Sequence, residues 1–163
     1  MCAIYTIGHS NVPTGRIIDL LRQYDVTSVV DARSMPYSRH NPQFNREMLC
    51  RRLEEAGITY AYAGDVLGGR PDDPACYEDG QLSHRLVAGR PWFKRGLARL
   101  IEMAGVRRTA VMCAEEDPAR CHRHHLIAQA LLEKGVTVWH IRASGRREKA
   151  HPISPQAEQL ALL

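Results

Sequence analysis

The sequence predicts an α/β fold: one three-layer α/β/α domain around a mostly parallel central sheet of about five strands. Two observations support this prediction. Short apolar, β-prone runs alternate with segments of helical apolar spacing along the 163 residues, and polar side chains follow the strand ends. A chain of this length is within the range of one domain. We expect a single domain over residues 1–163, with its core in about 3–142 and a basic tail and short C-terminal segment in 143–163.

Five runs have the length and composition of strands and are bounded by turn residues or polar loops. They are residues 3–7, 26–30, 58–62, 106–113 and 136–141. Because helical segments separate them, right-handed crossover connections should place helices on both faces of the sheet. The connection 63–80, which contains several glycines and prolines, is expected to be irregular and is a candidate lid.

Helices are expected where apolar residues recur every three or four positions. They are residues 14–24, the segment between Asn45 and Gly57, the segment from about Pro91 to Gly105, and the segment that follows Asp117 and Pro118 and stops at Gly135. Asn45 is a candidate N-cap, Gly57 a candidate C′ residue, and Asp117-Pro118 an N-cap and N1 pair. Ser154-Pro155 could open a further short amphipathic helix that ends in leucines.

Composition and hydropathy argue against a membrane-spanning protein, a secreted protein and a disulfide-rich protein. The hydrophobic fraction of 44% and charged fraction of 25% are ordinary for a soluble globular chain. No apolar run reaches membrane-spanning length and the N-terminus lacks the pattern of a signal peptide, so we expect a cytoplasmic protein without a membrane partner. Five cysteines at irregular spacings match no disulfide framework and are expected to be thiols. A net charge of +4 permits an anionic ligand or nucleic acid and requires neither, and the oligomeric state is left open.

Polar residues gather after four of the predicted strands. In chain order they are His9 and Ser10, Asp31 and Arg33, Gly69 and Arg70, and lastly Cys113, Glu115, Cys121, His122 and Arg123. Because the carboxyl ends of parallel strands meet at one edge of a sheet, these side chains should border a common cleft. Their convergence is stronger evidence for a site than any one of them alone.

Several of these residues lie in motifs that resemble a known family. The motifs are Tyr-Thr-Ile-Gly-His-Ser-Asn, Val-Asp-Ala-Arg-Ser-Met-Pro-Tyr-Ser-Arg with Asn-Pro-Gln-Phe-Asn, Leu-Gly-Gly-Arg, and Met-Cys-Ala-Glu-Glu-Asp-Pro-Ala-Arg-Cys-His-Arg. From about residue 5 to about residue 140 the chain resembles the domain of unknown function 488 family, which usually has valine at the position of Ala32. The resemblance implies an α/β fold and a shared polar site, but no reaction.

Candidate anion-binding residues surround the expected cleft. They are Ser10, Arg33, Arg39, Asn41, Arg46, Gly69, Arg70 and Arg123. Guanidinium groups near a helix N-terminus suit phosphate or carboxylate, although the arginines could equally be solvated and Arg33 could simply pair with Asp31. Neither GxGxxG nor GxxxxGK[ST] occurs, so a dinucleotide cofactor is not expected.

Candidate catalytic residues are of two kinds. His9, Asp31 and Glu115 could manage a proton, while Cys113 and Cys121, with His122 beside them, have the surroundings that activate a thiol. The alternatives are structural, since His9 and Asp31 could only cap or tether the chain and Cys113 could be a buried small hydrophobe. A phosphatase-like or rhodanese-like loop is disfavoured because acidic residues lie between Cys113 and Arg120.

A metal is a further possibility. Cys113, Cys121, His122 and His9 are candidate ligands for zinc or iron, although the spacing is not that of a structural zinc site. Cys121 and His122 are expected in the first turns of a helix, where adjacent side chains point about 100° apart.

The leading hypothesis is a cytoplasmic enzyme, a hydrolase or transferase that uses Cys, His and Asp groups on a phosphate-like or nucleotide-like anion. The alternatives are a module that binds nucleic acid or protein, and a Cys/His metal or thiol redox sensor.

Overall fold

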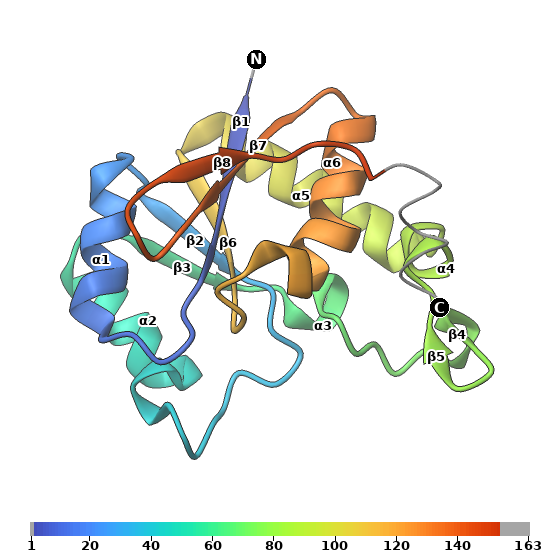
Figure 1. Cartoon of the computed structure of the whole chain (residues 1–163), viewed down its shortest axis with the longest axis horizontal. Coiled ribbons are helices and arrows are strands. Elements are labelled where there is room, and N and C mark those ends of the chain that lie inside the picture. Colours follow the sequence, from blue (N-terminus) through green and yellow to red (C-terminus); the bar gives the residue numbers. More distant parts are fainter. Residues whose placement is uncertain (1, 154–163) are drawn as a thin grey trace.

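The computed structural model describes residues 2–153 and confirms the α/β fold (Figure 1). Its main sheet has six strands, in the spatial order β3-β2-β6-β1-β7-β8. The strands are β1 (Ala3–Gly8), β2 (Ser28–Asp31), β3 (Thr59–Tyr62), β6 (Thr109–Cys113), β7 (Thr137–Ile141) and β8 (Arg147–Lys149). The first five in this list run parallel and β8 pairs antiparallel with β7, so the sheet is mostly parallel as predicted.

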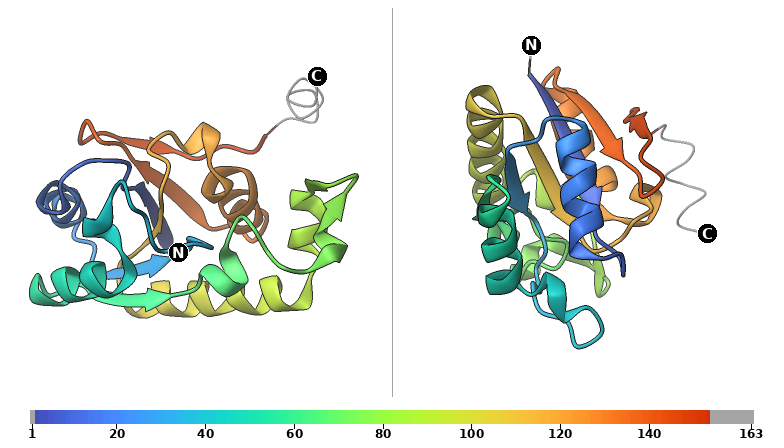
Figure 2. Two further views of the ribbon diagram at one scale, coloured as in Figure 1. Left: turned by 90° about the horizontal axis from the view of Figure 1, so that it is seen from below. Right: turned by 90° about the vertical axis from the view of Figure 1, so that its left-hand side faces the viewer.

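Helices cover both faces of the sheet, which makes three layers (Figure 2). On one face α1 (Thr14–Gln23) and α2 (Arg46–Glu55) pack their leucines and isoleucines against Tyr5, Val29 and Met112. On the other face α3 (Gly64–Leu67), α5 (Pro91–Val106) and α6 (Gln129–Glu133) pack against Ile4, Val30 and Val111. Neighbouring strand residues alternate between the two cores, as the period of two along a strand requires.

The helices follow their sequence signals closely. Asn45 is the N-cap residue of α2, although its side chain accepts a hydrogen bond from the Ser38 N–H instead of capping the helix. Gly57 follows the C-cap of α2 with φ +79°, a left-handed conformation that favours glycine. The helix α5 continues to Val106, so β6 begins at Thr109, three residues later than predicted.

Within the predicted basic tail, Arg147–Lys149 forms the edge strand β8, which the sequence did not indicate. A turn at Gly145, with φ +95°, reverses the chain after β7. Arg147 then lies over the ring of Trp139 at 4.0 Å from its centroid. The sequence signal was weak, since one glycine and a short charged run mark the turn and the strand. The C-terminal helix predicted from Ser154 lies outside the described residues.

The connection 63–80 is more regular than predicted. It contains α3, a 3₁₀ turn (Pro74–Cys76) and the first strand of a hairpin, β4 (Tyr77–Glu78) paired with β5 (Gln81–Leu82). Asp79 and Gly80 between them both have positive φ, as the favoured two-residue hairpin turn requires. The hairpin and α4 (His84–Ala88) lie at the opposite side of the molecule from α1 and α2 (Figure 1).

The segment after β6 also differs from its prediction. Asp117 caps Ala119 and Pro118 is at N1, as predicted, but they open only a 3₁₀ turn (Pro118–Arg120). Cys121 then has the extended conformation φ −134°, ψ 144°. The helix starts at His122 and continues as a π-helical stretch (Arg123–Ala128) into α6. The expectation that Cys121 lies within a helix was therefore wrong, and the argument that Cys121 and His122 diverge by a helical angle does not apply.

Candidate active site

The sheet topology places a cavity at the carboxyl end of β6. The helices after β1 and β2 lie on one face of the sheet and the helix after β6 lies on the other. Connections that leave neighbouring strands toward opposite faces open a crevice between them, where α/β proteins bind ligands. Here the cavity has a volume of about 410 Å³. It is lined by Arg33, Ser34, Met35, Gly69, Arg70, Cys113, Ala114, Glu115, Arg120, Cys121 and His122.

Glycines allow one wall of the cavity to come close to the others. A Cβ at Gly68 would lie 2.2 Å from Ser34 Oγ, and one at Gly69 would lie 3.0 Å from the His122 ring. Beside these glycines the Arg70 N–H donates to Ser34 Oγ at 2.9 Å. The Gly-Gly-Arg segment therefore packs directly on the loop after β2 and on the imidazole, which a side chain at either glycine would prevent.

Arg33 is buried and held at two edges of its guanidinium. Asp31, which is fully buried, accepts from Arg33 Nε and NH2, both at 2.8 Å. The Tyr60 hydroxyl donates to the same carboxylate at 2.6 Å, and burial with this bond raises the pKa of the phenol well above its usual range. The alternative that Asp31 tethers Arg33 is thus what the structure shows, yet Arg33 also lines the cavity.

His9 supports Arg33 from the other side. Its Nδ1 lies 2.7 Å from the Ser10 carbonyl, which can only accept, so Nδ1 has the proton and Nε2 accepts from Arg33 NH1 at 3.2 Å. The ring stacks on Phe44 with centroids 4.4 Å apart. Burial and the Arg33 charge outweigh the hydrogen bond to the Ser10 carbonyl and lower the pKa of His9 to about 4. His9 is therefore neutral near pH 7, and it does not line the cavity.

Two thiols and one imidazole form a cluster on the cavity floor. Cys113 ends β6 and is 1% exposed. Its Sγ lies 3.9 Å from His122 Nε2, and Cys121 Sγ lies 3.8 Å from His122 Nδ1. Taking one donor atom from each residue, all three lie within 4.8 Å of one another. These three residues could hold a metal ion, whereas both ring nitrogens of His9 are already engaged.

The two thiols have opposite tendencies to ionise. The hydrogen bond from Cys113, together with His122 and the Arg123 charge, holds the pKa of Cys121 well below its usual range. Burial raises the pKa of Cys113, which keeps its proton and donates to Cys121. Both shifts favour ionisation of Cys121 before Cys113, and both residues line the cavity.

Arg123 donates its side-chain hydrogen bonds mainly to backbone carbonyls of the loop after β6. It is fully buried, donates from Nε to Thr6 Oγ1 at 3.1 Å, and donates from its terminal nitrogens to the carbonyls of Glu115 and Glu116. Gly8 packs against the same loop, where an added Cβ would lie 1.6 Å from the Glu115 carbonyl oxygen. The structure therefore gives Arg123 a supporting position and does not bring it into the cavity.

Of the acidic residues in the loop after β6, Glu116 and Asp117 do not line the cavity. Glu116 accepts from Arg142 Nε and NH2 at 2.9 and 3.0 Å, which lowers the pKa of this carboxyl to about 2. Asp117 accepts from the Ala119 N–H at 3.0 Å. Of the three acidic residues, Glu115 lines the cavity. The sequence argument that this loop would repel an anion therefore applies only to Glu115.

The structure brings together about half of the predicted site. Arg33, Gly69, Arg70, Cys113, Glu115, Cys121 and His122 line the cavity. Asp31 and His9 support Arg33, and the Ser10 N–H donates to the Ala114 carbonyl at 2.8 Å. Arg39, Asn41 and Arg46 do not line it, and Arg46 instead lies over the Tyr62 ring.

Sequence reasoning missed Arg120, Ser34 and Tyr60. Arg120 lines the cavity, and its place in the motif that follows a predicted strand is the signal that could have identified it. The role of Tyr60 depends on strand pairing, because β2 and β3 lie side by side and bring its hydroxyl to Asp31. No local pattern identifies such a partner.

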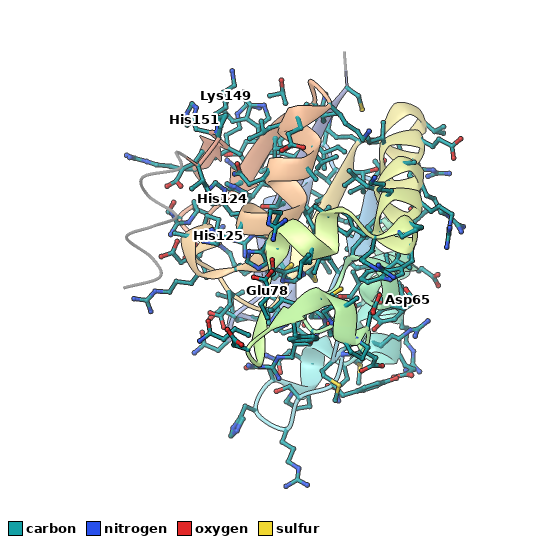
Figure 3. The ribbon with its side chains drawn as sticks, turned by 90° about the vertical axis from the view of Figure 1, so that its right-hand side faces the viewer. Asp65, Glu78, His124, His125, Lys149 and His151 are labelled. Carbon is teal, nitrogen blue, oxygen red and sulfur yellow. The ribbon has the colours of Figure 1, made fainter. Side chains whose placement is uncertain are left out.

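His124 and His125 lie on the side of the molecule that carries α4 and the hairpin (Figure 3). His124 Nδ1 lies 3.0 Å from His140 Nε2, and His140 Nδ1 lies 2.6 Å from the Thr6 hydroxyl. His124 and His140 thus form a hydrogen-bond chain that ends at Thr6, which also accepts from Arg123, while His125 Nε2 lies 2.6 Å from the Ala119 carbonyl. None of these three imidazoles lines the cavity.

Comparison with known proteins gives one result that bears on identity. A family model described as "Domain of unknown function DUF488" matches residues 13–131. Comparison with curated proteins and with solved structures finds no match. Within residues 2–153, no helix has the length and apolar character needed to cross a bilayer.

Proposed function

The chain belongs to the DUF488 family, a family without an assigned reaction, and from this premise we propose that it is an enzyme that binds a small phosphate-like anion at Arg33. The reaction proposed is a hydrolysis or a group transfer beside the Cys113, Cys121 and His122 cluster. The single observation that supports this proposal most directly is geometric: the buried Arg33 guanidinium, immobilised by Asp31, lines the same cavity as Cys113, Cys121 and His122.

Arg33 has the properties of a fixed anion contact. A guanidinium has five N–H donors, of which two are used by Asp31 and one by His9, so two remain. At 6% exposure the group is poorly hydrated, which strengthens its attraction for a negative ligand. Because Asp31 and His9 already fix its orientation, an anion binding there would lose little side-chain entropy.

The charges around the cavity favour an anion. Arg33, Arg70 and Arg120 line it together with one carboxylate, that of Glu115. Arg70 and Arg120 are exposed and stand at the rim, so they are free to close on a ligand. A cavity of about 410 Å³ is large enough for a nucleotide-sized ligand.

The thiol and imidazole cluster would supply the reacting group. Cys121 is the cluster thiol whose pKa is lowered, and a ring nitrogen of His122 lies 3.8 Å from its Sγ. Arg33 would hold the anionic group of the substrate while the bond next to it is broken. This division between a fixed guanidinium and a separate reactive cluster favours a reaction over recognition alone.

Titration with inorganic phosphate and with a nucleoside monophosphate tests the binding step. We expect Arg33→Lys to weaken binding at least tenfold, because a single ammonium cannot reproduce the fork held by Asp31 and His9. Arg51→Lys, on the exposed side of α2, is the matched control and should bind like the parent protein. Equal affinity of the Arg33 variant and the parent would refute the proposed site.

Turnover is tested separately with a panel of phosphomonoesters, nucleotides and 5′-phosphorylated oligonucleotides, following released product. Loss of turnover in Cys121→Ser is the expected result, because this variant removes a sulfur of the cluster and leaves the Arg33 contact in place. Binding without turnover of any class in the parent protein would favour a binding module over an enzyme.

A further inference from the structure

The cluster of Cys113, Cys121 and His122 has the donor atoms of a metal site. We propose that it binds one Zn²⁺ ion through these three side chains, with the fourth coordination position open to the cavity. The fourth ligand would be an oxygen of water or of a phosphate-like anion. For the anion, the inference rests on the proposed function.

The donor separations suit a tetrahedral zinc ion. With Zn–S near 2.3 Å and Zn–N near 2.0–2.1 Å, neighbouring donors in a tetrahedron lie about 3.5 to 3.8 Å apart. Cys121 Sγ is 3.8 Å from His122 Nδ1, and one donor atom from each of the three residues fits within 4.8 Å. The contact of Cys113 with the ring is to the other nitrogen, Nε2, at 3.9 Å, so Cys113 and the ring must shift relative to each other for all three donors to reach bonding distance.

His122 is oriented as a metal ligand. The Ala32 carbonyl lies 3.1 Å from His122 Nε2 and can only accept a hydrogen bond, so Nε2 has the proton. The lone pair is then on Nδ1, the nitrogen beside Cys121. Ligating histidines commonly donate their other N–H to a backbone carbonyl, which fixes the ring and its tautomer. Gly69 packs against the same ring and limits its rotation.

The sulfur atoms are placed to act as thiolates. The Arg123 N–H points at Cys121 Sγ at 3.5 Å, a weak bond that favours negative charge on sulfur. Cys113 is buried at the end of β6, where the strand ladder fixes its backbone. Two thiolates would balance the charge of a divalent ion, which offsets the cost of ionising the buried Cys113.

The number and kind of ligands identify the metal and the type of site. Two sulfurs and one nitrogen suit zinc, while iron–sulfur clusters use four cysteine ligands in most proteins. Structural zinc sites have four protein ligands, whereas catalytic sites have three and keep one position for water or substrate. All three residues line the cavity that Arg33 also faces, so the open position would lie beside the anion contact.

Elemental analysis and cobalt substitution test the site directly. The full chain, purified without chelator and dialysed against Zn²⁺, should retain close to one zinc per chain. Replacement by Co²⁺ should give near-ultraviolet sulfur-to-cobalt charge-transfer bands and the visible bands of a four-coordinate ion. Failure to retain zinc, or cobalt spectra without sulfur charge transfer, would overturn the proposal.

Variants locate the metal. Cys113→Ser, Cys121→Ser and His122→Asn should each reduce retained zinc at least tenfold, while Cys50→Ser, on α2, should not. Because a cluster variant could unfold, the parent protein provides a second test. Zinc should slow alkylation of Cys113 and Cys121, mapped by peptide mass spectrometry, and leave the half-buried Cys50 unaffected. Equal alkylation with and without zinc would contradict the site.

Phosphate separates this inference from the proposed function. Added phosphate should shift the visible cobalt bands of the parent protein and shift them less in Arg33→Lys, which should keep its metal. A protein that retains zinc but does not respond to phosphate would remove the proposed function and leave the metal site. If phosphate binding depends on Arg33 but the chain takes up no zinc, the metal site is refuted and the proposed anion contact is supported.

Discussion

Asp31 and Arg33 form a buried two-point ion pair, with Arg33 Nε and NH2 each 2.8 Å from a carboxylate oxygen of Asp31. The two residues are separated by one position, so in extended chain their side chains leave the same side of the backbone. The pair fixes the orientation of the Arg33 guanidinium, which is the proposed anion contact.

Removal of one partner should be costly. Asp31→Ala leaves an unpaired guanidinium at 6% exposure and should lower the free energy of unfolding by about 3–5 kcal/mol, measured by urea denaturation. Glu78→Ala breaks the exposed pair with Arg85 and serves as the control, with an expected loss under about 1 kcal/mol. Equal losses for the two variants would show that burial does not set the strength of the pair.

Acid should destabilise the protein through its buried histidines. Burial lowers the pKa of His9 to about 4 and that of His140 to about 3, both from 6.5. The unfolded chain therefore binds more protons below pH 6.5, and stability should fall as the pH drops from 6.5 toward 4. The contribution of His9 is on the order of 3 kcal/mol, complete above pH 6.5.

The slope of unfolding free energy against pH measures this effect. Between pH 4 and 6.5, His9→Gln should flatten the slope, and His40→Gln, which changes an exposed side chain, should leave it as in the parent protein. A parent protein whose stability does not change over this range would contradict the description of His9 as a buried neutral imidazole.

Gly8 should not tolerate a side chain. A Cβ there would lie 1.6 Å from the backbone oxygen of Glu115, so Gly8→Ala must displace the loop after β6 and should destabilise the fold by more than about 2 kcal/mol. Gly15→Ala, in α1, meets nothing within 4 Å and should stabilise the protein by about 0.5–1 kcal/mol. Thermal unfolding of the two variants in opposite directions is the expected result.

Arg123 should be irreplaceable by lysine. Its guanidinium serves Thr6 and the carbonyls of Glu115 and Glu116 at once, which one ammonium cannot do. Arg123→Lys should cost about 2–4 kcal/mol of unfolding free energy, because buried acceptors lose their donors. Arg120→Lys, at an exposed position, should change stability by less than about 0.5 kcal/mol. Similar denaturation midpoints for both variants would argue against a supporting role for Arg123.

The sequence anticipated much of the fold, because its signals are local. Ile17, Leu20 and Leu21 recur at helical spacing and lie buried in α1, and Gly57 ends α2 in the left-handed conformation expected of it. The β8 strand escaped prediction because its short charged run has no apolar alternation, and Arg147 is held there by packing on Trp139 from β7.

The sequence by itself determined where the candidate site lies, because residues that follow parallel strands must meet at one edge of the sheet. Only the tertiary structure decided what each side chain does there. Arg33 and Arg123 look alike in sequence, yet Arg33 borders the cavity and Arg123 binds backbone carbonyls behind it. Cys121 joins Cys113 and His122 because it is extended where helix was expected. Side-chain roles of this kind depend on contacts between distant segments, and neither composition nor periodicity records such contacts.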